Sequence, residues 1–293
     1  MLSWPELIGA MERALAQFSR GNVVNPVRDI LTIEEGHKYL GMMPAVAGDV
    51  MGLKFVTFYP VNATVGLPTH HATILLYDTG TGRPLAAMDG RLITEMRTAA
   101  VSAAVTRYLA PPNSRVLAIL GSGVQARAHL AALSHDRTFA ETRVWSRNVE
   151  HARRFASEHG VTAVASAELA ARDADVVVTA TAAREPILQG NWLKPGAHVN
   201  AVGSSRPDWR ELDDEAMRNV VVVDSREAAA GEAGDVILAG ATIYAEAGEI
   251  FAGTKAPSRD QTTIFKSLGL AIEDVAAAKL VLQKAQARSS QTR

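Results

Sequence analysis

Three small residues, Gly121, Gly123 and Ala126, have the spacing G-x-G-x-x-A that can hold the phosphates of a dinucleotide. The apolar run Val116–Leu120 leads into this turn, and a helix-forming segment follows it. In such a unit the first glycine permits the tight turn, and the second lets the backbone approach a pyrophosphate. The N–H groups of the new helix then face the anion. We expect a dinucleotide site here; the alternative is an ordinary strand-to-helix turn that contains glycine. The candidate contacts in the turn are Gly121, Ser122, Gly123, Val124 and Gln125.

The end of the next expected strand, Thr142–Trp145, indicates which dinucleotide is bound. An NAD site usually has an acidic residue about 20 positions beyond the turn, bonded to the ribose 2′-hydroxyl. Here the corresponding residues are Ser146, Arg147 and Asn148. Ser146 and Asn148 can donate hydrogen bonds, and Arg147 can pair with a 2′-phosphate. We therefore expect a preference for NADP(H) over NAD(H), unless Arg147 is simply a solvated surface arginine.

Apolar strands alternate with helical segments through the second half of the chain. This alternation is typical of the α/β class, with a parallel sheet that helices cover on both faces. It predicts a Rossmann-type, doubly wound dinucleotide domain over residues 113–269. The expected strands are Val116–Leu120, Thr142–Trp145, Val161–Val164, Val176–Thr179, His198–Ala201 and Val220–Asp224.

The first part of the chain, residues 1–112, is expected to form a second, mixed α/β domain. A short amphipathic helix comes first, and the turn cluster Asp78–Gly82 separates the last two extended segments. An Ala- and Val-rich helix, Thr98–Leu109, is stopped by a double proline. A C-terminal helix, residues 270–293, is expected to return to this domain. The expected extended segments are Asn25–Thr32, Tyr39–Pro44, Val50–Tyr59, Ala72–Asp78 and Pro84–Met88.

Composition excludes several classes of function. The chain has 293 residues, of which 47% are hydrophobic, so a substantial core can form. Its net charge is −1, without a basic stripe, which argues against nucleic acid as a partner. Cysteine is absent, which excludes disulfides and thiol catalysis. We see neither a signal peptide nor a membrane-length apolar run, so we expect a cytoplasmic enzyme.

His70, His71 and Lys54 could each take part in chemistry. The two histidines are adjacent on an expected strand, so they face opposite sides and cannot line one pocket together. No histidine pair has a metal-binding spacing such as HxxxH, and no metal is expected. Lys54 interrupts the apolar run Leu53–Val56, and alternation alone leaves open whether it faces a pocket or water.

Six blocks of sequence form a specific combination. They are Pro26–Arg28, Gly52–Pro60, Arg97–Ala100, Gly121–Ala126, Pro195–Gly203 and Phe265–Gly269. In these blocks the chain resembles the ornithine cyclodeaminase/mu-crystallin family over nearly its whole length. The segment Ser205–Asp214 is most similar to the mu-crystallin, or ketimine reductase, branch.

The resemblance implies a fold and a reaction class. The family joins a dinucleotide-binding domain to a second domain that forms a homodimer and caps the active site. Its known reactions are ornithine cyclisation to proline, oxidative deamination of alanine, and reduction of cyclic ketimines such as Δ1-pyrroline-2-carboxylate. Each moves a hydride between nicotinamide and a carbon that bears both nitrogen and carboxylate.

The resemblance also implies roles for individual residues. Arg28 and Lys54 match the family's substrate-binding cations, and they are the expected catalytic residues. Arginine suits bidentate carboxylate binding, and lysine supplies a charge that can also carry a proton. Arg97 and Thr98, expected at a helix N-terminus, would contact the cofactor pyrophosphate, and Arg97 would also assist at the substrate carboxylate. His70 matches a pocket position and is a candidate substrate contact; the alternative is a structural histidine.

Ser205, a candidate substrate contact, departs from the cyclodeaminase pattern. In cyclodeaminases, an aspartate implicated in deprotonating the substrate amine stands at this position. A serine hydroxyl cannot replace a carboxylate base near neutral pH. Reduction of a preformed imine needs no such base, so the departure favours ketimine reduction.

The expected function is therefore NADPH-dependent reduction of small cyclic ketimine carboxylates by a homodimer. The alternatives are ornithine cyclodeaminase or alanine-type dehydrogenase activity, and a non-catalytic, mu-crystallin-like binding protein. Glu232, Asp235 and Glu249 have no assigned role and are expected in solvated loops. Motif position makes further residues candidate cofactor neighbours: Thr73, Thr179, Val202, Ser267 and Gly269.

Overall fold

The computed structural model of the chain describes residues 2–257 and 260–291. The chain divides into two compact units: unit 1, Met1–Arg97 with Gly269–Arg293, and unit 2, Thr98–Leu268. The division falls inside helix α2 (Arg91–Leu109), whereas we had expected a boundary after residue 112. The expectation failed because the double proline marks the end of α2, while the first turns of this helix pack within unit 1.

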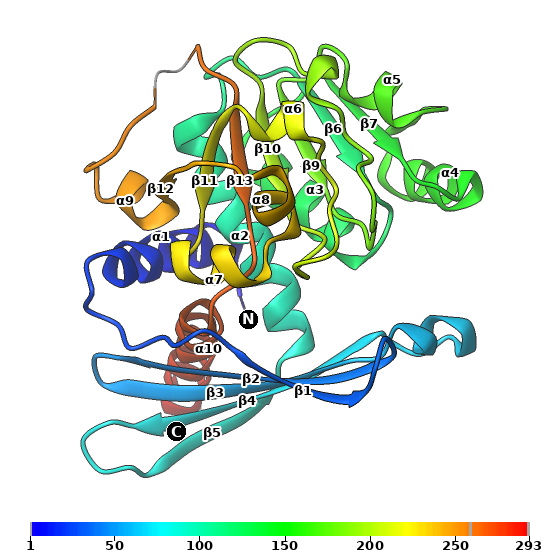
Figure 1. Cartoon of the computed structure of the whole chain (residues 1–293). Coiled ribbons are helices and arrows are strands. Elements are labelled where there is room, and N and C mark those ends of the chain that lie inside the picture. Colours follow the sequence, from blue (N-terminus) through cyan, green and yellow to red (C-terminus); the bar gives the residue numbers. More distant parts are fainter. Residues whose placement is uncertain (1, 258–259, 292–293) are drawn as a thin grey trace. The chain divides into compact units, whose positions relative to one another are not determined.

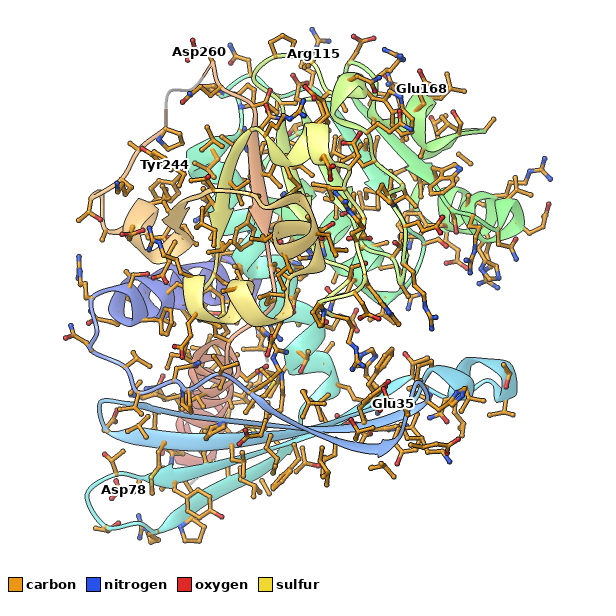
Figure 2. All side chains as sticks on the ribbon, viewed as in Figure 1. Glu35, Asp78, Arg115, Glu168, Tyr244 and Asp260 are labelled. Carbon is orange, nitrogen blue, oxygen red and sulfur yellow. The ribbon has the colours of Figure 1, made fainter. Side chains whose placement is uncertain are left out.

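Unit 1 is built on an antiparallel sheet with the strand order β1-β2-β3-β4-β5 (Figure 1). Tight turns join most neighbours, as in the β4–β5 hairpin, where Asp78 (Figure 2) accepts hydrogen bonds from the backbone N and Oγ1 of Thr81 at 2.8 and 2.6 Å. A short 3-10 helix, η1 (Pro60–Val65), connects β3 to β4. The strands are β1 (Asp29–Glu34), β2 (Lys38–Ala47), β3 (Val50–Phe58), β4 (His70–Asp78) and β5 (Pro84–Asp89).

The two faces of this sheet differ. The C-terminal helix α10 (Ala271–Gln291) packs against β2, β3 and β4 on one face (Figure 1) and also contacts helix α1 (Trp4–Ser19). Gly52 and Ile74 are buried on this covered face, and a Cβ on Gly52 would lie 2.8 Å from Val275. The opposite face alternates with it and carries half-buried apolar side chains such as Leu53 and Leu75, which are paired across β3 and β4.

Unit 2 is a parallel sheet with the strand order β12-β11-β13-β10-β9-β6-β7-β8 (Figure 1). From β6 the chain runs outward through β7 to β8, then crosses back to β9 on the other side of β6. In such a Rossmann-type sheet, ligands bind beyond the carboxyl ends of the strands where the direction of winding changes. The strands are β6 (Val116–Leu120), β7 (Glu141–Trp145), β8 (Thr162–Ala163), β9 (Val176–Thr179), β10 (His198–Ala201), β11 (Val220–Val223), β12 (Ile243–Glu246) and β13 (Thr263–Lys266).

Helical segments separate most of these strands. The longest helix between two strands of this sheet is α3 (Val124–Asp136), which follows the glycine-rich turn directly. The others are α4 (Val149–His159), α5 (Ala167–Ala171), η2 (Gly190–Trp192), α6 (Asp214–Met217), α7 (Arg226–Glu232), α8 (Gly234–Ala239) and α9 (Ala247–Phe251). Two strands were missed by the sequence reading, β12 and β13, and β13 lies in the middle of the sheet. The expected helix 270–293 is α10; residues 292–293 lie outside the described residues. Within the described residues, no helix is long and apolar enough to span a bilayer.

Candidate functional site

Three cations and two acids meet in unit 1 at the start of α10. Lys54, in β3, has its Nζ 2.5 Å from Oδ2 of Asp274. Arg97, in α2, places Nε 3.1 Å from Oδ1 of the same carboxylate and Nη1 2.6 Å from Oε2 of Glu273. Arg28 donates a hydrogen bond from Nη2 to the carbonyl oxygen of Gly269 at 2.9 Å. We call these five charged residues and Gly269 the cation cluster.

Gly269 lets the cation cluster form. Its φ is +79°, a left-handed conformation that glycine adopts without strain. A Cβ at this position would lie 2.8 Å from Cζ of Arg97 and closer still to two guanidinium nitrogens. The guanidinium therefore occupies the space that any other side chain would fill. The structure places Gly269 against Arg28 and Arg97, and its expected contact with the cofactor stays a prediction.

The cluster carries one net positive charge when all its groups are ionised. Burial lowers the pKa of Lys54 to about 8; Asp274 acts to raise it, and Arg97 and Arg28 lower it further. Burial also acts against the charge of Arg97, but Asp274 and Glu273 outweigh it and raise the pKa of this guanidinium. The pKa of Asp274 is lowered, because Arg97 and Lys54 overcome the opposing effect of burial. Lys54 is thus the member that can change its protonation state near neutral pH.

Sequence reasoning placed Lys54 and Arg97 only in part. Lys54 could have faced either side of its strand, and the structure turns it to the face that α10 covers, where it is 2% exposed. Arg97 and Thr98 were expected at a helix N-terminus. This was wrong: α2 begins at Arg91, so both residues lie inside the helix, where the backbone N–H groups are already bonded. Thr98 is buried and is the first residue of unit 2.

The candidates on β4 lie on different faces of the sheet. His70 pairs with Phe58 in the register of β3 and β4, stacks on its ring at 4.5 Å, and shares the face of Lys54. His71 and Thr73 pair with Thr57 and Phe55 and line a shallow hollow on the opposite, uncovered face. The structure therefore does not bring Thr73 to the cation cluster. In the described part of the chain, no three His, Asp or Glu side chains are arranged to hold a metal ion.

In unit 2, the turn between β6 and α3 has the geometry that its glycines predict. Gly121 has φ +128°, and a Cβ there would lie 2.5 Å from the carbonyl oxygen of Ala180, just beyond β9. Gly123 is the N-cap of α3; a Cβ on it would meet nothing within 4 Å, and no side chain caps the helix. The first N–H groups of α3 are thus left for another acceptor. Val124 is 47% exposed beside this open space, and Gln125 follows it in the first turn.

The end of β7 lies directly beside this turn. Gly121 N donates to Trp145 O at 2.8 Å, and Ser122 Oγ donates to Ser146 Oγ at 3.1 Å. Arg147 is exposed. Asn148 caps α4, because its Oδ1 accepts from Glu150 N at 3.0 Å and His151 N at 3.4 Å. The side-chain amide of Asn148 has one oxygen and one nitrogen, and this cap uses only the oxygen.

The carboxyl ends of β9, β10 and β13 share a buried polar network that sequence reasoning missed. Glu211 accepts hydrogen bonds from Thr179 Oγ1 at 2.7 Å, Thr181 N at 2.7 Å and Gly203 N at 2.9 Å. Asp235 accepts from Glu211 N at 2.7 Å and pairs with the fully buried Lys266 at 2.8 Å. The network fixes the loops that follow β9 and β10. Its sequence signal was the polar run at the end of β9, which could not show that acids from distant loops would meet it.

The remaining predicted residues lie around this network. Thr179 is fully buried within it. Val202 directly precedes Gly203 in the loop after β10, and the exposed Ser205 lies two positions after Gly203. Ser267 follows Lys266 and is 2% exposed, and its hydroxyl has no hydrogen-bond partner among the described residues. Next to it, Leu268 N donates to the buried Asp224 at 2.6 Å, which holds this segment in place.

Two of the three unassigned carboxylates lie outside solvated loops, against expectation. Asp235 is fully buried at the start of α8. Glu249 forms a capping box with Glu246 at the start of α9 and pairs with Arg226 at 2.6 Å. Glu232, at the end of α7, is half-buried. Asp235 and Glu249 support local structure, and their partners Lys266 and Arg226, which are distant in sequence, decided where they lie.

Unit 2 as a whole fits a dinucleotide. A pyrophosphate needs close backbone approach and free N–H groups, and the turn at Gly121–Gly123 supplies both. The unpartnered hydroxyl of Ser267 and the adjacent strand ends provide polar groups beyond the turn. We find no side chain in the turn that would fill the phosphate position, since the space at Gly123 is open.

Comparisons with known proteins agree with this geometry. The family model of the ornithine cyclodeaminase/mu-crystallin family matches residues 1–289. The mouse (Mus musculus) protein named ketimine reductase mu-crystallin is 51% identical over 283 residues, covering 94% of this chain and 90% of its own length. The structure of Thermococcus litoralis Δ1-pyrroline-2-carboxylate reductase with NADH and L-proline has a TM-score of 0.93 at 39% identity, covering 98% of this chain and 95% of that one. An archaeal alanine dehydrogenase dimer with bound NAD has a TM-score of 0.92 at 35% identity, covering 98% and 93%. The chain belongs to the ornithine cyclodeaminase/mu-crystallin family.

Proposed function

We propose that this protein is an NADPH-dependent reductase of small cyclic ketimine carboxylates. It is an oxidoreductase of its family and uses a nicotinamide cofactor. The observation that carries the proposal is the charge of the cation cluster, in which three buried or half-buried cations face two acids. One negative charge would neutralise the cluster, and a substrate carboxylate supplies one.

The residues of the cluster have separate roles. Arg28 offers a planar guanidinium, which suits bidentate binding of a carboxylate. Lys54 adds positive charge and, with a pKa of about 8, can donate a proton to the imine nitrogen near neutral pH. Arg97 is held by Glu273 and Asp274, so it assists through its charge and by fixing these acids. When bound, the reduced cofactor supplies the hydride that the imine carbon gains as its nitrogen gains the proton.

The named relatives support this choice of substrate. The mouse relative is named a ketimine reductase, and the Thermococcus litoralis structure holds L-proline, the amine that reduction of Δ1-pyrroline-2-carboxylate yields. Ser205 argues against a cyclodeaminase, because a neutral hydroxyl cannot deprotonate a substrate amine near neutral pH. Ammonia release from L-ornithine or L-alanine in the presence of NAD would favour the cyclodeaminase or dehydrogenase alternative instead.

The test is oxidation of NADPH in the presence of Δ1-pyrroline-2-carboxylate. It is measured as the loss of absorbance of the reduced cofactor. Wild-type protein should consume NADPH only when the imine is present. Lys54→Ala should lower kcat/KM by roughly 100-fold or more, because it removes general-acid catalysis. NADPH binding should stay near wild type in Lys54→Ala, since the dinucleotide turn lies in unit 2. Unchanged turnover in Lys54→Ala would contradict the assigned role.

The preference for NADPH over NADH rests on Arg147. This exposed cation follows β7, whose end is bonded to the dinucleotide turn, and no acid stands beside it at Ser146 or Asn148. A 2′-phosphate would be attracted here, whereas an NAD site would normally hold a carboxylate. Arg147→Ala should weaken NADPH binding by roughly 10-fold and leave NADH binding nearly unchanged, corresponding to one lost charged contact. Tighter binding of NADH than NADPH by wild type would refute the preference.

We also propose that two copies pair through the uncovered face of the unit 1 sheet. Leu53, Phe55 and Leu75 lie on this face, which α10 leaves open. Apolar side chains gathered on one face of a sheet are costly to leave in water and are typical of a protein interface. Leu53→Glu should convert a dimer to a monomer in light scattering after gel filtration. Leu92→Glu, at an exposed position on α2, is the control and should leave the dimer intact.

A further inference from the structure

We propose that Asp274 is a positioning residue that keeps Lys54 protonated and aimed for reaction, whereas its neighbour Glu273 holds Arg97 and the start of α10. The two acids are consecutive in the first turn of α10, both are fully buried, and both contact Arg97. Asp274 also forms an ion pair with Lys54. This inference deepens the proposed function and rests on it.

The contacts divide the two acids by task. Asp274 bridges two cations, with Oδ1 toward Arg97 at 3.1 Å and Oδ2 toward Lys54 at 2.5 Å. Oε2 of Glu273 accepts from Nη1 of Arg97 at 2.6 Å, while its Oε1 accepts a hydrogen bond from Leu270 N at 3.1 Å. Glu273 therefore fastens α2 to the start of α10. Asp274 fastens Lys54 as well, and it fixes the direction of the ammonium group.

The surroundings of Lys54 make it depend on this one acid. Lys54 is 2% exposed, so water contributes little to its charged form. Arg97 and Arg28 lower the pKa of Lys54, and Lys54 in turn lowers the pKa of His70, so none of these three neighbours supplies a negative charge. Removing the negative charge of Asp274 would leave a buried ammonium among cations, which favours its neutral form.

The protonation state of Lys54 controls two steps at once in the proposed reaction. The protonated form attracts the substrate carboxylate and carries the proton that the imine nitrogen must gain. The neutral form does neither. Since the pKa of Lys54 is about 8, kcat/KM should fall as the pH rises through this value in the wild-type enzyme. Loss of Asp274 moves this fall to lower pH, because an opposite charge within a few ångströms changes a pKa by roughly one to three units.

The experiment compares the pH profiles of kcat/KM for Δ1-pyrroline-2-carboxylate in wild type, Asp274→Asn and Glu273→Gln. Both variants remove one buried acid from Arg97 without changing the size of the side chain. We expect Glu273→Gln to keep the wild-type midpoint. Asp274→Asn should have a lower midpoint, with activity at pH 8 reduced by roughly 5-fold to 500-fold, for shifts of one to three units, and a loss that shrinks as the pH falls. Titration of the substrate itself is common to all three proteins and cannot separate them.

Two further measurements keep the outcome decisive. Asp274→Glu retains the charge and should keep the midpoint closer to wild type than Asp274→Asn does. Lys54→Arg keeps a permanent charge at this position but cannot release its proton near neutral pH, so it should still bind L-proline across pH 8 while it loses most of its turnover. Equal midpoints in Asp274→Asn and Glu273→Gln, or a midpoint in Asp274→Glu that falls as far as in Asp274→Asn, would overturn the inference. Failure of the proposed function looks different: wild type would not reduce the imine at any pH. Binding of L-proline, measured by calorimetry across the same pH range, would then still report the charge of Lys54.

Discussion

Replacing Gly269 with alanine should disrupt the cation cluster from within. Gly269 has φ +79°, and an alanine in this left-handed conformation costs about 1–2 kcal/mol. The new Cβ would also lie 2.8 Å from Cζ of Arg97, so the guanidinium must move. Moving it strains the bonds to Glu273 at 2.6 Å and Asp274 at 3.1 Å, and a hydrogen bond to a charged group contributes about 1.5–3 kcal/mol. Together these effects should lower the free energy of unfolding by roughly 3–5 kcal/mol.

A matched variant separates the two contributions. Gly21, also in unit 1, has φ +76°, and a Cβ there would meet nothing within 4 Å. Gly21→Ala should therefore carry only the backbone cost of about 1–2 kcal/mol. Urea unfolding, followed by circular dichroism at one protein concentration, measures both variants. Gly269→Ala should also lower kcat/KM for the imine while NADPH binding stays near wild type. If Gly269→Ala costs no more stability than Gly21→Ala, the guanidinium of Arg97 does not lie where the structure places it.

Three further predictions concern unit 2. Asp235→Ala leaves Lys266 buried without its acid and should lower the free energy of unfolding by roughly 3–5 kcal/mol in urea; a loss below about 1 kcal/mol would show that the pair is not closed. Asn148→Ala removes the cap of α4 and should cost about 1 kcal/mol in the same assay, while a stability equal to wild type would argue against the cap. Arg147→Glu should reverse the cofactor preference from NADPH to NADH, as measured by the two dissociation constants, and an unaltered ratio would remove Arg147 from the site.

Local patterns made unit 2 predictable. Apolar runs ended by glycine or a polar residue located β6 and β9 at their observed bounds, and the extended segment His198–Ala201 located β10. The strand β13 was missed because it is short: in Thr263–Lys266 only two apolar residues stand between a threonine and a lysine. A buried lysine in a central strand is stable only beside an acid, and that acid, Asp235, comes from a separate loop. No local pattern contains this information.

The same limit applies to the cation cluster. The family motifs identified Arg28, Lys54 and Arg97, but the sequence did not reveal the acids that hold two of them. Glu273 and Asp274 look like ordinary acids in the first turn of a helix, where they favour the helix dipole. Their contact with Lys54 and Arg97 depends on α10 folding back across the sheet of β1–β5. Asp274 and Glu273 follow Arg97 in the sequence by 177 and 176 residues. The start of α2 was expected too late, at Thr98 instead of Arg91. Only one residue lies between the end of β5 and this helix, so no loop in the sequence separates the two elements.

The position of α10 after unit 2 in the sequence sets an order for folding. On the ribosome, all of unit 2 is made before Gly269–Arg293, while β1–β5 have already emerged. Until α10 emerges, the face of that early sheet that holds Gly52 and Ile74 has no helix to cover it, and Lys54 and Arg97 lack the acids of α10. We therefore expect the nascent chain to expose this apolar and positively charged face while unit 2 is made. Unit 2 can fold before α10 completes unit 1.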